Sequence, residues 1–275
     1  MRLLDRLVTG YSLLPHHPGK GVVVNRLLTR IPVEPDCYRI CTRMGIRFEC
    51  DLNDLVGRWI YYGIFERRDL FRLSRIVKPG QTIVDAGANV GYYSLLFAKW
   101  LSGSGSIHAF EPFPGTAKHF VRNLQLNPAL QPAVHLHQMA LSDRAGTVSM
   151  DIADPANSGC NYISTSSGSI RAMTLDEFVA EREITRLDLL KIDVEGAEVS
   201  LLRGAEQSLK RFRPVVIIEI NPSALRRFGQ TAEDVVSLLG SRCYRLTLAT
   251  RWGTLRPLAT LPTQGEPNVF ALPIN

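Results

Sequence analysis

The stretch Thr82–Leu96, TIVDAGANVGYYSLL, joins a short apolar run to a glycine turn and then to an apolar helical pattern. Its β-branched start is typical of a buried strand, and Asp85 stands where that strand stops. Gly87 and Gly91 carry no Cβ, so they allow a sharp turn and a close approach between backbone and ligand. Strand, turn and helix together predict a binding site for a nucleotide-type cofactor.

The residues of this turn indicate which cofactor it suits. Asn89 stands where the dinucleotide fingerprint G-x-G-x-x-G has its second glycine, and the Lys-Ser/Thr pair of a phosphate-binding P-loop does not follow. Asp85 would repel a pyrophosphate, whereas its charge suits the ammonium group of S-adenosylmethionine. The turn therefore favours a cationic cofactor over a phosphate-bearing one.

Glu111 is the second candidate cofactor residue. It follows the predicted strand 106–110 and lies 20 residues beyond Gly91, a spacing at which a carboxylate meets a ribose diol. The structural alternative is a cap for the helical stretch that follows. The combination of Glu111 with Asp85 and two glycines favours ribose binding.

Two later segments complete the predicted site. The turn after the third predicted strand, 133–141, is expected to pass the adenine, which assigns Ala140, Leu141 and Ser142 to the cofactor. Residues 151–171 are rich in Ser, Asn and Gly and predict a mobile loop or hairpin, with Asn157, Asn161 and Tyr162 as candidate substrate contacts. A plain surface hairpin is the alternative for this second segment.

Length and composition fit one α/β domain with an extension. The chain has 275 residues, 45% of them hydrophobic, and we expect an N-terminal extension or lid at 1–45 and the main domain at 46–275. No apolar run approaches the ~20 residues of a membrane span, and five cysteines, an odd number, are expected to be reduced thiols. We therefore expect a cytoplasmic protein without a transmembrane segment.

Charge is unevenly distributed along the chain. The net charge of +6 divides into +4 for residues 1–50, −3 for 51–200 and +5 for 201–275. Basic ends suit an anionic substrate or a membrane surface. Ordinary solubilising surface charge is the favoured explanation of these basic ends.

The motifs VDAGANVGYYS, FEP, ALSD, KIDVEGAE, VVIIEIN and NVFALP occur in this order over roughly residues 45–275. In this the chain resembles the FkbM family of S-adenosylmethionine-dependent methyltransferases. The resemblance implies an α/β class I methyltransferase fold, which is Rossmann-like. Its sheet would have seven mostly parallel strands, the last one reversed, with helices on both faces. It also implies O-methylation of a hydroxyl on a small molecule or sugar, in natural-product or glycan biosynthesis.

The resemblance extends to single residues around the cofactor. It assigns Asp85, Gly87, Asn89 and Gly91 to the methionine end, Glu111 to the ribose and the ALSD turn to the adenine. Glu66 matches the family's acidic residue before the motif helix, although a carboxylate at a helix N-terminus is an equally good explanation.

Asp193 ends the central strand and is the first candidate for catalysis, because it is expected to face the transferring methyl group or the incoming hydroxyl. Lys191 lies on the same strand face and is expected to orient Asp193 or meet an anionic substrate. Glu195 and Glu219 are candidate substrate contacts, and a helix-start role is the alternative for Glu195. A second possibility is a divalent cation such as Mg²⁺, held by Asp193 with Glu195, Glu219 or Asn221.

The sequence leaves three alternative functions. Base methylases that act on amino groups carry N/D-P-P-Y/F at the end of the central strand, where this chain reads DVEG, so we expect no nucleic acid partner. A nucleic acid or protein acceptor stays open as an alternative. An NAD-dependent sugar oxidoreductase is disfavoured by Asn89, and the third function is a non-enzymatic cofactor-binding module. The oligomeric state is left open.

Overall fold

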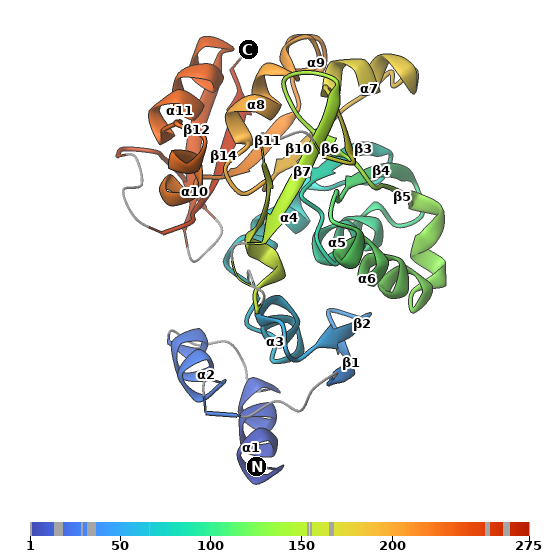
Figure 1. The fold of residues 1–275 in the computed structure, drawn as a ribbon, viewed down its shortest axis with the longest axis vertical. Coiled ribbons are helices and arrows are strands. Elements are labelled where there is room, and N and C mark those ends of the chain that lie inside the picture. Colours follow the sequence, from blue (N-terminus) through green and yellow to red (C-terminus); the bar gives the residue numbers. More distant parts are fainter. Residues whose placement is uncertain are drawn as a thin grey trace.

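The protein is described by a computed structural model, shown as a ribbon in Figure 1. The described residues are 2–13, 19–28, 30–31, 37–65, 67–152, 154, 156–164, 168–250, 254–260 and 265–274. Every structural statement below concerns these residues.

The centre of the fold is one large sheet with the strand order β13-β12-β14-β11-β10-β3-β4-β5. Its strands, in that order, are Leu255–Pro257, Tyr244–Ala249, Asn268–Pro273, Val215–Glu219, Leu189–Ile192, Gln81–Ala86, Gly105–Phe110 and Val134–His137. Strands β11, β10, β3, β4 and β5 are parallel, and β14 runs antiparallel to both β11 and β12. This confirms the predicted α/β class I methyltransferase fold with its reversed last strand.

The predicted count of seven strands was one too low. The eighth strand, β13, is a three-residue edge strand that pairs with β12. A run this short contains no alternation of apolar and polar residues, so it gives no strand signal in the sequence.

Neighbouring residues of each buried strand point to opposite faces of the sheet, so both faces carry apolar side chains. Helices cover both of these faces. Ile83 belongs to a core cluster shared with α4 (Arg67–Ile76), α5 (Tyr92–Leu101) and α6 (Pro114–Gln125). Val84, the next residue, belongs to a second cluster. The helices of that second cluster are α7 (Leu175–Glu181), α8 (Glu198–Arg203), α9 (Glu206–Phe212), α10 (Pro222–Arg227) and α11 (Ala232–Ser241).

A second, smaller sheet has the order β6-β9-β7-β8, with bounds Ala140–Leu141, Ile170–Met173, Gly146–Ile152 and Asn161–Ser164. The third predicted strand, 133–141, is therefore divided, because β5 ends at His137 and β6 pairs with β9 in the other sheet. The polar segment 151–171 contributes to the antiparallel hairpin β7–β8, which carries the short 3-10 helix η2 (Ser158–Cys160). A second 3-10 helix, η1 (Pro128–Ala133), precedes β5.

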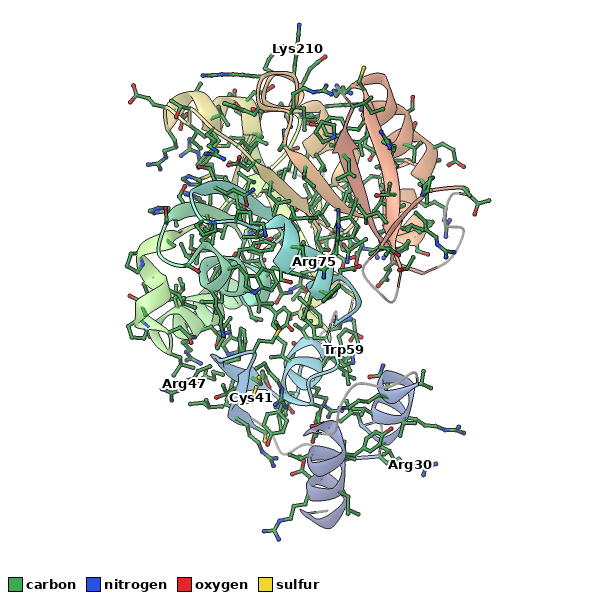
Figure 2. The ribbon with its side chains drawn as sticks, turned by 180° about the vertical axis from the view of Figure 1, so that it is seen from behind. Arg30, Cys41, Arg47, Trp59, Arg75 and Lys210 are labelled. Atoms are coloured by element: carbon green, nitrogen blue, oxygen red, sulfur yellow. The ribbon has the colours of Figure 1, made fainter. Side chains whose placement is uncertain are left out.

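The N-terminal part lies at one end of the molecule (Figure 1). It contains α1 (Arg2–Leu13), α2 (Lys20–Leu28), the hairpin of β1 (Tyr38–Arg43) and β2 (Ile46–Asp51), and α3 (Leu55–Tyr61). The hairpin crosses position 45, where the sequence suggested a boundary, and Phe48 of β2 is buried in the main core. From behind, Trp59 and Cys41 lie between the N-terminal helices and the large sheet (Figure 2).

Among the described residues, no helix combines the length and the apolar character needed to cross a bilayer.

Candidate active site

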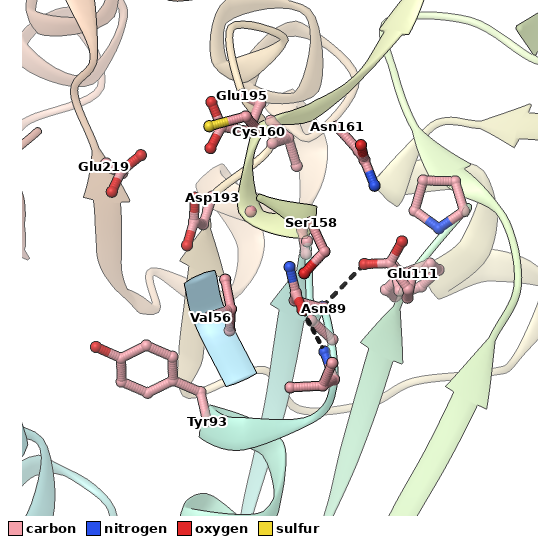
Figure 3. Close-up of a pocket in the computed structure, with 18 of the residues that line it drawn as sticks. Val56, Asn89, Tyr93, Glu111, Ser158, Cys160, Asn161, Asp193, Glu195 and Glu219 are labelled. Carbon is pink, nitrogen blue, oxygen red and sulfur yellow. Dashed lines mark hydrogen bonds between the residues drawn. The ribbon is translucent and has the colours of Figure 1, made fainter. Parts of the chain in front are cut away.

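A cavity of about 350 Å³ opens at the carboxyl ends of β3, β4, β10 and β11 (Figure 3). The chain leaves β3 toward β4 and β5 on one side, and continues with β10 and β11 on the other side. In open α/β sheets, ligands bind at such a switch point. The volume lies within the range of small-molecule sites.

Most of the predicted site residues line this cavity: Gly87, Asn89, Glu111, Ala140, Leu141, Asn157, Asn161, Lys191, Asp193, Glu195 and Glu219. Five others do not line it, namely Asp85, Gly91, Ser142, Tyr162 and Asn221. Glu66 lies outside the described residues.

The two glycines of the turn are needed for packing within the protein. Gly87 has φ 77°, and a Cβ there would lie 1.7 Å from the carbonyl oxygen of Asp193. Gly91 has φ 85°, and a Cβ there would lie 2.3 Å from the ring of Phe120. Gly87 lines the cavity, whereas the close approach at Gly91 is to an aromatic ring of the core and not to a ligand.

Asn89 fixes the shape of the turn between them. Its φ of 49° lies in the left-handed region, where Asn is tolerated better than most residues. Its Oδ1 accepts a hydrogen bond from the backbone N–H of Val90 at 2.7 Å, and its own N–H donates to Glu111 Oε2 at 2.8 Å. Asn89 thereby connects the turn after β3 to the carboxylate that follows β4.

Glu111 is a buried carboxyl group held from two sides. Besides Asn89, the backbone N–H of Phe113 donates to Glu111 Oε1 at 2.9 Å. Burial raises the pKa of Glu111 to about 7, against the effect of these two hydrogen bonds. Phe113 is the N-cap residue of α6, so Glu111 supports the start of this helix while it also lines the cavity.

Asp85 occupies a different place from the predicted one. It is fully buried, and it accepts a hydrogen bond from Ser94 Oγ at 2.6 Å. Lys191 is its register partner on β10, and the Lys191 Nζ lies 3.8 Å from Asp85 Oδ1. Because Asp85 faces Lys191 and does not line the cavity, its position gives no support to the predicted contact with a cofactor ammonium group.

Lys191 also reaches the candidate catalytic residue. Its Nζ donates to Asp193 Oδ2 at 3.0 Å and lies 4.7 Å from the centre of the Tyr93 ring. The Lys191 side chain is 3% exposed and that of Asp193 is 26% exposed. The buried ammonium group of Lys191 therefore binds one oxygen of Asp193, and the Asp193 carboxylate remains open to the cavity.

Three carboxyl groups gather at the side of the cavity formed by β10 and β11. Ligand oxygens of Asp193, Glu195 and Glu219 all lie within 4.8 Å of one another. Burial raises the pKa of Glu195 to about 9, and the neighbouring charges of Asp193 and Glu266 add to this shift. Glu195 is thus protonated at neutral pH and can donate a hydrogen bond.

Asn221 does not belong to this group. Its Oδ1 caps α10 by accepting from the N–H groups of Ser223 and Ala224, and its Nδ2 donates to Glu266 Oε1 at 2.8 Å. Glu266 lines the cavity, so Asn221 contributes to the site by holding this carboxylate.

The polar segment supplies part of the cavity wall. Asn157 and Asn161 line it, and so does Cys160, whose Sγ accepts from Asn157 Nδ2 at 2.9 Å. Figure 3 shows Cys160 on the same side as Glu195. Tyr162 lies outside, where the Arg227 guanidinium stacks 4.6 Å from the centre of its ring.

The opposite end of the cavity is mostly apolar. Ala140 and Leu141 line it as predicted, together with Met139, Phe110 and Pro112. Ser142 is buried, and its N–H donates to the carbonyl of Met173 at 2.9 Å, so it serves the small sheet instead.

Sequence reasoning missed the contribution of the N-terminal part. Val56 and Trp59 of α3 and the following Phe65 also line the cavity. The aromatic cluster in WIYYGIFE is the signal that such a wall leaves in the sequence, but only the three-dimensional fold shows where it packs.

Residues 85–246, more than half of the chain, match the family model described as the methyltransferase FkbM domain. The hexuronic acid methyltransferase AglP of Haloferax volcanii is 30% identical over 156 residues, which cover 56% of this chain and 59% of the relative. The 31-O-demethyl-FK506 methyltransferase FkbM of Streptomyces tacrolimicus is 28% identical over 200 residues, covering 58% and 73%.

Solved structures give weaker likenesses. An FkbM methyltransferase from Methylobacillus flagellatus aligns with a TM-score of 0.46 and 17% identity, over 78% of this chain and 52% of that one. This structure and AglP are thus each spanned over less than two thirds of their own length.

The match to the family model favours methyl transfer over the NAD-dependent alternative. By this match, the chain belongs to the FkbM methyltransferase family.

Proposed function

We propose that the protein is an S-adenosylmethionine-dependent O-methyltransferase that acts on a hydroxyl group of a small molecule or sugar. The observation that carries this proposal is one cavity with the buried Glu111 at its apolar end and Asp193 among carboxylates at its other end. The name of one relative mentions a 31-O position, which agrees with a hydroxyl acceptor, and the name of another mentions a sugar acid.

The cavity fits the cofactor at its apolar end. Glu111 is held by two backbone N–H groups and has further lone pairs, which suit the two hydroxyls of a ribose. Phe110, Met139 and Leu141 offer apolar surface for a purine ring. The cofactor supplies an electrophilic methyl group, and Gly87 and Asn89 would contact its methionine part.

The acceptor occupies the acidic end in this proposal. Methyl transfer to an alcohol needs a route for the hydroxyl proton, and Asp193 accepts it on the oxygen that Lys191 does not hold. The protonated Glu195 and the carboxylate of Glu219 form hydrogen bonds with neighbouring hydroxyls, which favours an acceptor with several hydroxyl groups.

A divalent cation on Asp193, Glu195 and Glu219 is the alternative route, because hard oxygen ligands suit Mg²⁺ and a bound cation lowers the pKa of a hydroxyl. We favour proton transfer to Asp193, since Lys191 already holds one of its two oxygens and leaves fewer oxygens for a metal ion. Turnover that persists after treatment with EDTA supports this choice, whereas turnover that needs added Mg²⁺ contradicts it.

Calorimetry with S-adenosylhomocysteine and NAD tests the cofactor. We expect binding of S-adenosylhomocysteine alone, and binding of NAD alone would refute the proposal. Transfer of a labelled methyl group to a panel of sugars, small-molecule alcohols, RNA and protein tests the acceptor class.

We further propose that residues 1–45 form an extension to a domain at 46–275, and that the enzyme acts in the cytoplasm.

A further inference from the structure

The cavity has a wall that comes from two distant parts of the chain. Val56 and Trp59 of α3 form one half, and η2 with its flanking residues Asn157 and Asn161 forms the other. Helix α3 precedes the segment that matches the family model, whereas η2 lies inside it. A contact between the two halves therefore decides whether the cavity is closed on this side.

Asp54 makes this contact with both of its carboxylate oxygens. Oδ2 accepts from the backbone N–H of Gly57 at 2.9 Å and caps α3. Oδ1 accepts from the backbone N–H of Ser158 at 2.5 Å, across 104 residues of sequence. One side chain thus ends the helix on one side and fastens η2 on the other.

Two neighbouring contacts keep the halves together. The backbone N–H of Leu55 donates to the carbonyl of Ala156 at 2.8 Å. A Cβ at Gly159 would lie 3.2 Å from Val56 Cγ2, so η2 packs directly on α3. Asp54 lies at the centre of an ordered contact and not at the tip of a free loop.

We propose that Asp54 is a positioning residue that holds the 157–161 segment over the cofactor cavity. It does not line the cavity itself, so it acts through the residues of η2 and α3. Without the bond to Ser158, the wall is free to move away from the cavity. Ser158 and Asn161 lie on the side of the cavity where Asn89 and Glu111 are (Figure 3), so a bound cofactor would lose contacts there. The inference rests on the proposed function only through the identity of the ligand used to test it.

Asp54→Asn separates the two roles of the side chain. An amide has one acceptor oxygen, which is sufficient for the helix cap, while its NH₂ group then faces the Ser158 N–H and cannot accept from it. Ser158→Pro breaks the same bond from the other side, because proline has no N–H. Asn157 has φ −142° and ψ 93°, an extended conformation that suits a residue before proline.

Thr231→Ala is the matched control. Thr231 caps α11 in the way that Asp54 caps α3, and it does not line the cavity. It loses a helix cap without touching the wall, so its effect shows how much a lost cap alone changes the measured quantities.

Calorimetry with S-adenosylhomocysteine and hydrogen exchange of residues 156–161 form the test. For Asp54→Asn we expect the Kd to rise about tenfold, because one hydrogen bond to a charged group is lost. We also expect hydrogen exchange of these amides to become faster. Ser158→Pro should raise the Kd by the same factor, and the double variant should lose no more affinity than either single variant. The Kd of Thr231→Ala should stay within about twofold of that of the native chain.

The inference would be overturned by unchanged hydrogen exchange in Asp54→Asn. It would also be overturned if the losses of affinity of the two single variants add in the double variant. A native chain that does not bind S-adenosylhomocysteine refutes the proposed function instead. In that event the exchange measurement still decides the role of Asp54.

Discussion

Asp193 directly follows β10, and the Nζ of Lys191 on that strand lies 3.0 Å from Asp193 Oδ2. The same ammonium group lies 3.8 Å from Asp85 Oδ1 on the neighbouring strand. One buried cation thus serves two carboxylates, one fully buried and one open to the cavity. The Lys191 side chain therefore contributes both to the buried pair with Asp85 and to the position of the Asp193 carboxylate at the cavity.

Replacing Lys191 by Met should lower the free energy of unfolding by about 3 kcal/mol or more, because it leaves the buried Asp85 without its cation. Chemical denaturation measures this loss. The double variant Lys191→Met, Asp85→Asn should regain most of the stability, since it removes the charge together with its partner. A double variant as unstable as the single one would contradict this account of the pair.

Replacing Asp193 by Asn should leave the affinity for S-adenosylhomocysteine within a few fold, while turnover falls by about 10²- to 10⁴-fold, the usual contribution of a general base. Calorimetry and a labelled-methyl assay measure the two quantities on the same preparation. Near-normal turnover would remove Asp193 from the mechanism.

Replacing Glu111 by Gln should weaken S-adenosylhomocysteine binding roughly 10- to 100-fold, because hydrogen bonds to a charged acceptor are lost. The pKa of Glu111 is raised to about 7, so the native group ionises as the pH rises from 6 to 8 and becomes a better acceptor. The affinity of the native chain should therefore increase over this interval. The Gln variant should show no such increase, and a parallel increase in both proteins would exclude Glu111 as the cause.

Replacing Glu195 by Gln should change how stability depends on pH. Burial raises the pKa of Glu195 to about 9, so the folded chain holds this proton more tightly than the unfolded chain does. Its contribution to stability is complete below the unfolded value of 4.5 and is lost as the pH rises through about 9. Between pH 7 and 9 the melting temperature of the native chain should fall more than that of Glu195→Gln.

The exposed Glu233 of α11 provides the control for this experiment. Glu233→Gln should follow the native chain over the same interval. The interval starts at pH 7 because His108 and His137, with pKa values lowered to about 4, titrate below it. A fall of equal size in the native chain and in Glu195→Gln would show that other groups cause it.

The strand ends were predictable from the sequence. Parallel strands have near-continuous apolar runs, and the first polar residue after each run lies at the same edge of the sheet. This rule places Glu111 and Asp193 at one cavity although they are far apart in the chain. The reversed last strand was expected only from the resemblance to the family.

The direction of side chains near those ends was not predictable. On a strand buried on both faces, apolar residues point both ways, so the sequence does not show that Asp85 faces Lys191. The contact of Gly91 with Phe120 and that of Asp54 with Ser158 join residues distant in sequence. Such contacts follow from the packing of whole elements and leave no local pattern.

The missing Cβ of Gly87 connects two parts of the site that are otherwise described separately. The turn that would contact the cofactor lies against the backbone carbonyl of Asp193, with no room for one more carbon atom between them. In the proposed reaction, a contact between two main chains, and not adjustable side chains, would set the separation between methyl donor and acceptor. A change of acceptor preference would then arise in the surrounding wall, with the distance on which transfer depends left unchanged.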